Sequence, residues 1–249
     1  MRILTVDQLI DLTLVATTER SGFPAANVQH PHLTRVWRSV TPAAQRLTFN
    51  AGTGLTIAPT VAALLAHNLT AAATASVEQN SIDDWAAPPV SVAFDVTDPL
   101  SLAYMPGSAY QYLSFIFDDA ANPDGYIEIG RAMAGVYWQS VEELERGTDD
   151  EVEDTTVTSE SETGQGFADL GVQKQKYAVS FGIMQPETRV SLKEIYTAVG
   201  QYMPVVMVKD ENALDVFPPL YCTMRKTPKF TGAGGGLWRD GGLEFTEAF

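Results

Sequence analysis

Short apolar segments recur through the first half of the chain, and turn-forming residues separate them. Most of these segments are rich in β-branched or aromatic residues, which is typical of strands rather than helices. Several short strands at this spacing predict a mainly β fold, with a β-sandwich in the first half. The segments are LTLVATT, RLTFNAG, VAALLAHNL, ATASVEQ, VSVAFDV, YLSFIF and GYIEIGRAMAGVYW.

One of these segments, within TVAALLAHNL, contains enough alanine to pass for a helix. It is short and uniformly apolar, and it ends in an asparagine, so a buried strand is the better interpretation.

The stretch YQYLSFIFDDAANPDGYIEIGRAMAG places a polar loop between two strand-like flanks. A calcium loop of the EF-hand kind needs an acidic first ligand and a bidentate Glu at the twelfth place. Ala120 and Arg131 occupy those places, whereas Asn-Pro-Asp-Gly is typical turn chemistry, so the stretch predicts a β-hairpin. Weak cation binding remains as an alternative, and its ligands would be Asp118, Asp119 and Asp124.

The acidic stretch Glu142–Glu162 is the best candidate for a domain boundary. It holds ten acids and one arginine in a chain whose net charge is −15, and it is rich in Ser and Thr. Such a composition buries too little apolar surface to fold on its own, which predicts a solvated linker. We therefore expect a sandwich over residues 1–140, an acidic linker or loop over 141–166, and a small α+β module over 167–249.

Within that module, KYAVSFGIM and PVVMVKD read as strands, and SLKEIYTAVG has helical spacing. Ser191 is the predicted N-cap of the helix, and Gly200 is its predicted stop. LYCTMRKTPKF and WRDGGLEFTEAF are expected to form two more strands around a flexible hairpin tip at Gly232–Gly236.

Composition excludes several classes of function. The negative charge and the lack of a basic patch argue against nucleic-acid binding. No apolar run is long enough to span a membrane and no signal peptide is indicated, so a soluble product made in the cytosol is expected. The single cysteine, Cys222, rules out an internal disulfide, and its strand context predicts an inert thiol.

No set of residues has the pattern of a catalytic or cofactor site, so we expect no enzyme, cofactor or metal site. His30 and His32 read as loop residues rather than metal ligands, and His67 reads as a core or turn histidine. No nucleophile elbow is present, and GAGGG lacks the third glycine of a dinucleotide site. A glycan-cleaving enzyme that uses Asp118, Asp119 or Glu128 remains the weakest hypothesis.

The first half resembles a discoidin-like, or galactose-binding-like, domain over roughly residues 12–138. The resemblance rests on Asn27 before Trp37-Arg38-Ser39, on His67-Asn68-Leu69 and on NPDGYIEIG. It implies a β-sandwich jelly roll, and similar stretches occur in tail proteins of phages and prophages. Some members of the wider fold bind sugars, but no ligand-binding set of that fold matches this sequence.

The end of the chain is similar to phage tail-tip proteins of the distal tail and minor tail class. The matching residues are Pro228, Phe230, Trp238, Glu244 and Phe245. This resemblance implies a small β-barrel-like module that forms a six-fold ring beneath the tail tube, with tail-tip and tail-tube proteins as partners. It also implies a virion location at the tail tip or baseplate, after assembly in the host cytoplasm.

The leading hypothesis is therefore a structural component of a phage tail tip that assembles as a cyclic oligomer. Aromatic residues and Met are enriched at subunit interfaces, so the predicted assembly contacts are Tyr202, Met203, Phe217 and Trp238. The alternative is a carbohydrate-binding module for a glycan of the host surface. Its predicted stacking platforms are Trp85, Tyr104, Tyr110 and Trp138.

Overall fold

The computed structural model describes the chain except residues 6, 145–148, 161–165, 211–212, 215–216 and 249. It divides into two compact units, each described by itself below. The sandwich unit covers Leu4–Trp138, and the C-terminal unit combines Met1–Ile3 with Gln139–Phe249. Strands dominate both units, which confirms the mainly β fold class. Within the described part of the chain, no helix is both long enough and apolar enough to cross a membrane.

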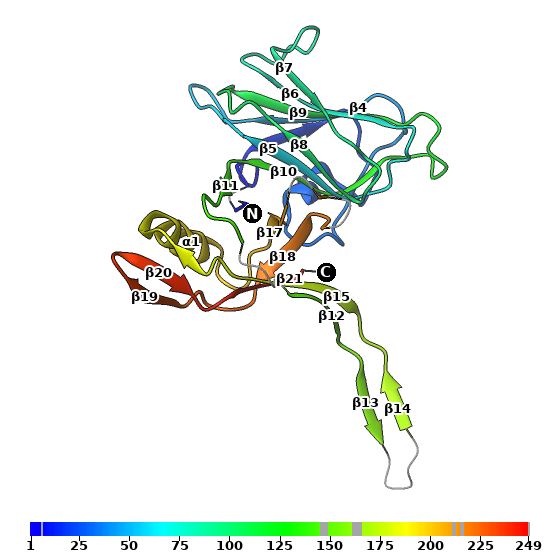
Figure 1. Ribbon diagram of the computed structural model, residues 1–249. Helices are drawn as coiled ribbons and strands as arrows, with labels where there is room; N and C mark the ends of the chain where they lie inside the picture. The colour runs from blue at the N-terminus through cyan, green and yellow to red at the C-terminus, as the bar shows by residue number, and fades with distance from the viewer. Residues whose placement is uncertain (6, 145–148, 161–165, 211–212, 215–216, 249) are drawn as a thin grey trace. The chain divides into compact units, whose positions relative to one another are not determined.

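The sandwich unit consists of two antiparallel sheets (Figure 1). The five-stranded sheet has the order β2-β4-β9-β6-β7, and the four-stranded sheet has the order β3-β10-β5-β8. A short 3₁₀ helix, η1 (Ala25–Gln29), precedes β3. The strands are β2 (Thr13–Ala16), β3 (Trp37–Arg38), β4 (Gln45–Asn50), β5 (Val61–His67), β6 (Thr74–Asn80), β7 (Val90–Ala93), β8 (Leu100–Tyr104), β9 (Tyr112–Asp118) and β10 (Glu128–Gly135).

The order of strand pairing makes this unit a jelly roll. β6 pairs with β7, β5 with β8, β4 with β9 and β3 with β10, so that each pair encloses the previous one. This nested pairing, divided between two sheets, is the jelly-roll arrangement. It confirms the predicted sandwich, but it also shows that the predicted hairpin at residues 110–135 is wrong. Its two flanks are strands, β9 and β10, yet they lie in different sheets because the intervening loop crosses between them.

Alternation along the strands builds the core between the two sheets. In β4 every second residue is buried, and Phe49 meets Phe115 of β9 with ring centroids 5.9 Å apart. Trp37 of β3 is fully buried and lies 6.2 Å from Phe117 of β9. The segment Val61–His67 forms strand β5, as predicted, and its first five residues are buried.

The C-terminal unit is built on a seven-stranded sheet with the order β11-β1-β17-β18-β21-β15-β12. One strand, β1, comes from the N-terminus of the chain, which no sequence pattern indicated. A separate three-stranded sheet, β16-β20-β19, and one α-helix complete the α+β module. The elements are β1 (Arg2–Leu4), β11 (Tyr137–Gln139), β12 (Asp149–Asp154), β13 (Val157–Glu160), β14 (Gly166–Asp169), β15 (Gln173–Val179), β16 (Ile183–Met184), α1 (Pro186–Val199), β17 (Val205–Val208), β18 (Leu220–Met224), β19 (Phe230–Gly234), β20 (Leu237–Asp240) and β21 (Leu243–Glu247).

Helix α1 begins five residues before the predicted N-cap, Ser191, so that prediction is wrong. Pro186 takes the first helical position, where its missing N–H costs nothing. The helix N-terminus receives a carboxylate from far away in sequence, since Glu142 accepts hydrogen bonds from Gln185 N (2.8 Å) and Thr188 Oγ1 (2.6 Å). Gly200 ends the helix with a φ of 59°, as predicted.

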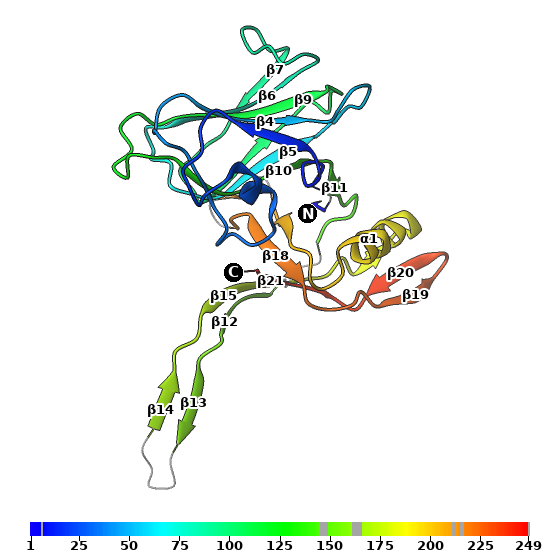
Figure 2. The same ribbon diagram turned by 180° about the vertical axis from the view of Figure 1, so that it is seen from behind.

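The acidic stretch forms strands rather than the predicted linker. β12 pairs with β15, and β13 pairs with β14, so residues 149–160 and 166–179 form a ribbon that we call the acidic ribbon. Both views show β13 and β14 side by side (Figures 1 and 2). The parts of the predicted linker at 145–148 and 161–165 lie outside the described residues. Two polar strands pair here because lysines on β15 lie opposite acids on β12, a register that composition does not reveal.

The last predicted strands divide in two. KYAVSFGIM breaks at Gly182, whose φ is 65°, into β15 and β16, which belong to different sheets. LYCTMRKTPKF contains β18 and ends on the first residue of β19, Phe230, whereas WRDGGLEFTEAF contains the last three residues of β20 and all of β21. Gly235 and Gly236 have positive φ between β19 and β20, which confirms the predicted hairpin tip.

Candidate functional sites

Two of the acids proposed for cation binding or glycan cleavage, Asp119 and Asp124, hold loops in place. Asp119 is 2% exposed, and its carboxylate accepts hydrogen bonds from Thr70 N (2.8 Å), Thr70 Oγ1 (2.8 Å) and Asn122 Nδ2 (2.9 Å). Asp124 accepts one from Asn68 Nδ2 at 2.9 Å, and Asp118 is exposed. No group of three or more metal-ligating side chains lies together among the described residues.

Glu128 forms an ion pair with Arg38, so it does not form a free carboxylate pair with Asp119. The geometry therefore places these acids in the support of the loop between β9 and β10.

An arginine–aromatic cluster lies beside these loops, and the sequence analysis did not single it out. We define it as Arg20, Phe23, Arg38, Tyr126 and Glu128. The Arg38 guanidinium lies 4.0 Å from the centre of the Phe23 ring and 5.0 Å from that of Tyr126. The Arg20 guanidinium lies 4.9 Å from the Tyr126 ring.

Within the cluster the two guanidinium groups differ in their surroundings. Arg38 is held by Glu128, whereas Arg20 is exposed, and no acid pairs with it in the described part of the chain. The cluster thus presents one guanidinium that pairs with no acid among the described residues and lies over a half-buried aromatic ring. Its members come from segments about 100 residues apart, and the only sequence signal was that Arg38, Tyr126 and Glu128 fall in the stretches that carry the discoidin resemblance.

The four predicted stacking aromatics do not form one platform. The Trp85 ring lies over Arg46 of β4 at 4.8 Å, and its indole N–H donates to Asp83 Oδ1. Tyr104 is 38% exposed and packs edge-on against Tyr137, with centroids 6.1 Å apart. Tyr110 packs against the hydrophobic core and pairs with Ile57 through its backbone. Trp138 of β11 is half-buried.

The histidines are not gathered into one site. The His30 and His32 rings stack with centroids 5.0 Å apart in the loop after η1. His67 bonds through Nε2 to Ser101 Oγ at 3.1 Å, while its buried Nδ1 has no partner among the described residues. Burial lowers the pKa of His67, so the neutral imidazole is favoured.

Cys222 is fully buried, and burial raises the pKa of its thiol, which fits the predicted inert cysteine.

Two of the four predicted assembly residues contact cations within the C-terminal unit. Trp238 lies against the Arg189 guanidinium of α1 at 4.0 Å, and Phe217 lies 3.8 Å from Lys209 Nζ. Met203 is half-buried. Tyr202 alone among the four is strongly exposed, at 77%.

The acidic ribbon carries several exposed aliphatic side chains, whereas only one of the four predicted assembly residues is strongly exposed. Every residue of β12 and β13 is exposed. Four aliphatic side chains on the ribbon are more than half exposed: Val152 (61%), Val157 (65%), Leu170 (89%) and Val172 (58%). Acids surround them, and the ion pair of Lys176 with Glu151 (3.2 Å) joins the two strands.

The bend of the ribbon requires a glycine. Thr155 N donates a hydrogen bond to Val172 O (3.2 Å), and Val172 N donates one to Thr155 Oγ1 (2.8 Å). A Cβ on Gly171 would lie 2.2 Å from the Thr155 carbonyl carbon, which is far inside van der Waals contact. The ribbon is therefore a defined structure and not a loosely paired loop.

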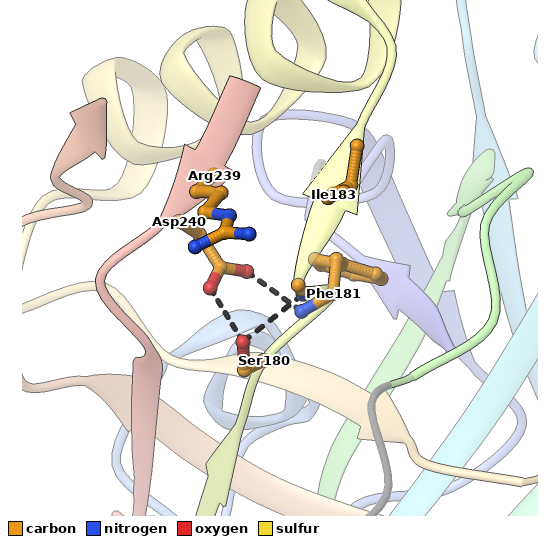
Figure 3. Close-up of a pocket in the computed structure, with 6 residues that line it drawn as sticks. Ser180, Phe181, Ile183, Arg239 and Asp240 are labelled. Carbon is orange, nitrogen blue, oxygen red and sulfur yellow. Dashed lines mark hydrogen bonds between the residues drawn. The ribbon is translucent and has the colours of Figure 1, made fainter. Parts of the chain in front are cut away.

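A cavity of about 520 Å³ opens beside the three-stranded sheet of the C-terminal unit (Figure 3). Phe181, Ile183, Arg239 and Asp240 are among its lining residues. Asp240 accepts hydrogen bonds from Ser180 Oγ (2.7 Å) and Phe181 N (2.8 Å), so its charge is used internally. Arg239 is exposed, and Ile183 is 49% exposed.

No protein-family model and no curated protein matches this chain. Among solved structures, it is similar over 51% of its length to a chitosan-binding module of a chitosanase/glucanase from Paenibacillus sp. IK-5, with 12% identity, 96% of that chain covered and a TM-score of 0.41. A family 32 carbohydrate-binding module from C. perfringens NanJ, solved with galactose, shows 11% identity over 55% of this chain and 100% of that one, with a TM-score of 0.42.

A fucose-binding module from Streptococcus pneumoniae shows 6% identity over 52% of this chain and 96% of that one, with a TM-score of 0.42. At these TM-scores the overlays carry no weight for function.

Proposed function

We propose that this chain is a structural subunit of a protein assembly, and that its C-terminal unit joins neighbouring subunits through the acidic ribbon. The observation that carries the proposal is the ribbon itself, a defined two-stranded structure with four aliphatic side chains more than half exposed.

A two-stranded hairpin is marginally stable in water because it has no core of its own. The β13–β14 pair belongs to no larger sheet, and none of its residues whose side chains the structure describes is buried. Contact with another subunit would bury Val157 and Leu170 and add the missing third layer or strand. A partner surface therefore accounts for both the exposed apolar residues and the precise Gly171 bend.

The finer form of the proposal is a component of a phage tail tip or baseplate that forms a ring beneath the tail tube. It is supported by the resemblance of Pro228, Phe230, Trp238, Glu244 and Phe245 to the closing pattern of tail-tip proteins. In this proposal the sandwich unit lies at the periphery of the ring, and the location is the virion.

The test compares the full chain with a variant in which residues 155–172 are replaced by Asn-Gly. This two-residue turn closes a hairpin between Asp154 and Gln173, which already pair, so β12 and β15 should remain intact. Light scattering across concentration should show association of the full chain and a monomer for the variant. Equal masses for both proteins at every concentration would refute the proposal.

A second function, glycan binding by the sandwich unit, is favoured by the arginine–aromatic cluster. The exposed Arg20 guanidinium provides hydrogen-bond donors for sugar hydroxyls or carboxylates, and the Tyr126 ring over which it lies holds it in position. The contact between Arg20 and Tyr126, and not the overlays with carbohydrate-binding modules, supports this function.

Glycan screening of the full chain tests this function, with Arg20→Ala as the loss variant. A bound glycan should lose about tenfold in affinity in that variant, which corresponds to one hydrogen bond to a charged group. Arg35→Ala is the control, because Arg35 is exposed and lies outside the cluster. Absence of any bound glycan, or an equal loss in the control, would count against the cluster.

A further inference from the structure

The C-terminal unit carries a positively charged surface, which is complementary in charge to the acidic ribbon. The segment Arg225–Lys229 places three cations within five residues, and Arg239 of β20 adds a fourth. We call these residues the cationic face: Arg225, Lys226, Lys229 and Arg239. All four side chains are exposed.

Backbone hydrogen bonding and strand pairing place part of this face next to the cavity. Gly241 N donates to Lys229 O at 2.8 Å, and Phe230 pairs with Asp240, a cavity-lining residue. Arg239 lines the cavity directly, opposite Ile183 in the sheet register. Lys229 and Arg239 therefore flank an opening whose walls include the apolar side chains of Phe181 and Ile183.

Nearby acids neutralise only part of this face. Glu244 pairs with Lys226 at 3.4 Å, and Asp240 is engaged by Ser180 and Phe181. No acid pairs with Arg225, Lys229 or Arg239 in the described part of the chain. Three cations thus remain available in a protein whose net charge is −15.

The ribbon has the complementary pattern. Its two lysines lie opposite Glu151 and Glu153 in the β12–β15 register. Five other acids have no cationic partner among the described residues: Asp149, Asp150, Asp154, Glu160 and Asp169. Leu170, 89% exposed, stands directly after Asp169 and is the most exposed aliphatic residue of the ribbon.

We infer that the acidic ribbon of one copy docks on the cationic face of a second copy, with a ribbon aliphatic side chain such as Leu170 in the cavity beside Arg239. This inference rests on the proposed assembly function and names the partner surface. A volume of about 520 Å³ is within the range of ligand-sized pockets, and its mixed apolar and cationic lining fits an aliphatic side chain flanked by acids.

Such a contact joins two different surfaces of the same chain. A contact of this type generates rings when the rotation closes and filaments when it does not. Because the paired charges are exposed, the association should weaken as salt concentration rises.

Two blocked variants test the contact directly. The first lacks residues 155–172, replaced by Asn-Gly, and can only accept a ribbon. The second carries Arg225→Glu, Lys229→Glu and Arg239→Glu and can only donate one. Each alone should be a monomer, and an equimolar mixture should form a one-to-one complex by light scattering, with the summed mass of the 27.0 kDa triple variant and the shorter ribbon-less variant. Lys193→Glu, which reverses an exposed lysine on α1, is the control for charge reversal outside the cationic face and should associate like the unmodified chain.

A compensating change distinguishes a loss of charge complementarity in the triple variant from misfolding of that variant. Adding Glu160→Lys and Asp169→Lys to the ribbon should restore self-association of the triple variant. Association that is lost on removal of the ribbon but retained in the triple variant would overturn this inference and leave the assembly function standing. Association that survives removal of the ribbon would overturn both, and so would a monomeric unmodified chain.

Discussion

The substitution Asp7→Asn should strongly destabilise the sandwich unit, because it leaves a buried arginine without its counter-charge. Arg131 of β10 is 1% exposed and Asp7 is 5% exposed, and Arg131 Nη2 lies 3.2 Å from Asp7 Oδ2. The Asp7 carboxylate also accepts hydrogen bonds from Leu9 N (3.1 Å) and Ala134 N (3.4 Å). The asparagine side chain would keep an acceptor oxygen for these amides, so the main loss is the charge.

The distance sets the scale of the effect. At an effective dielectric constant of about 20, two unit charges 3.2 Å apart attract by about 5 kcal/mol. Removing both ions from water offsets most of that gain, so the intact pair contributes little net stability. Removing one partner retains the desolvation cost of the other, and the expected loss is about 3–5 kcal/mol. That is a large part of the about 5–15 kcal/mol that stabilises an ordinary domain.

Urea unfolding followed by tryptophan fluorescence measures the loss, since Trp37 is fully buried in the same core. The double variant Asp7→Asn with Arg131→Met removes both charges and should recover most of the free energy of unfolding. A loss below about 1 kcal/mol for Asp7→Asn would show that water reaches the pair. A double variant no more stable than the single one would show that charge isolation is not the cause.

Three further perturbations follow from single contacts. Burial lowers the pKa of His67 below its usual 6.5, so the unfolded state takes up protons first; stability should fall as pH drops below about 6.5, and His67→Gln should flatten that part of the urea-midpoint profile. Partial burial acts to raise the pKa of Glu142, but hydrogen bonds from Thr188 and Gln185 lower it overall. Glu142→Gln should therefore increase amide exchange in the first turn of α1 and lower the stability of the helix by about 1 kcal/mol. Glu143→Gln, the control, should do neither. A Cβ on Gly130 would lie 2.8 Å from Ala66 Cβ and 3.0 Å from Leu33 O, so Gly130→Ala should cost about 1–3 kcal/mol in thermal unfolding, whereas Gly232→Ala, with nothing within 4 Å, should be neutral.

The strands of the sandwich unit can be predicted from the sequence because apolar residues occupy its buried positions. Alternation in segments such as Gln45–Asn50 reflects one face packed on the core, and that signal is local. It identifies strands but not their partners. Strand β1 joins a sheet whose other members lie more than 130 residues away, and β9 turns away from β10 into the opposite sheet. Pairing of this kind depends on the whole fold, so a local pattern predicted a hairpin where the chain crosses between sheets.

The candidate sites were less predictable than the strands. Aromatic type alone suggested Trp85 and Trp238 as contact residues, yet each ring is covered by an arginine from another element. The arginine–aromatic cluster depends on Arg20 and Tyr126, which are brought together only when the loops of the jelly roll fold. Residue type indicates what a side chain can do, whereas its neighbours decide whether it is free to do it.

In the acidic ribbon the hydrophobicity of the sequence does not predict the strands that form. Composition marks Glu142–Glu162 as a stretch that cannot build a core, and that is true of the folded ribbon as well. What lets β12 pair is charge at the opposite positions of β15, where Lys174 and Lys176 face Glu153 and Glu151. An acidic strand followed some twenty residues later by a strand with alternating lysines is a signal that can be read from sequence. Because β12 and β13 are held by cross-strand pairs and not by burial, Val152 and Val157 remain exposed, and this property makes the ribbon suited to contact another subunit.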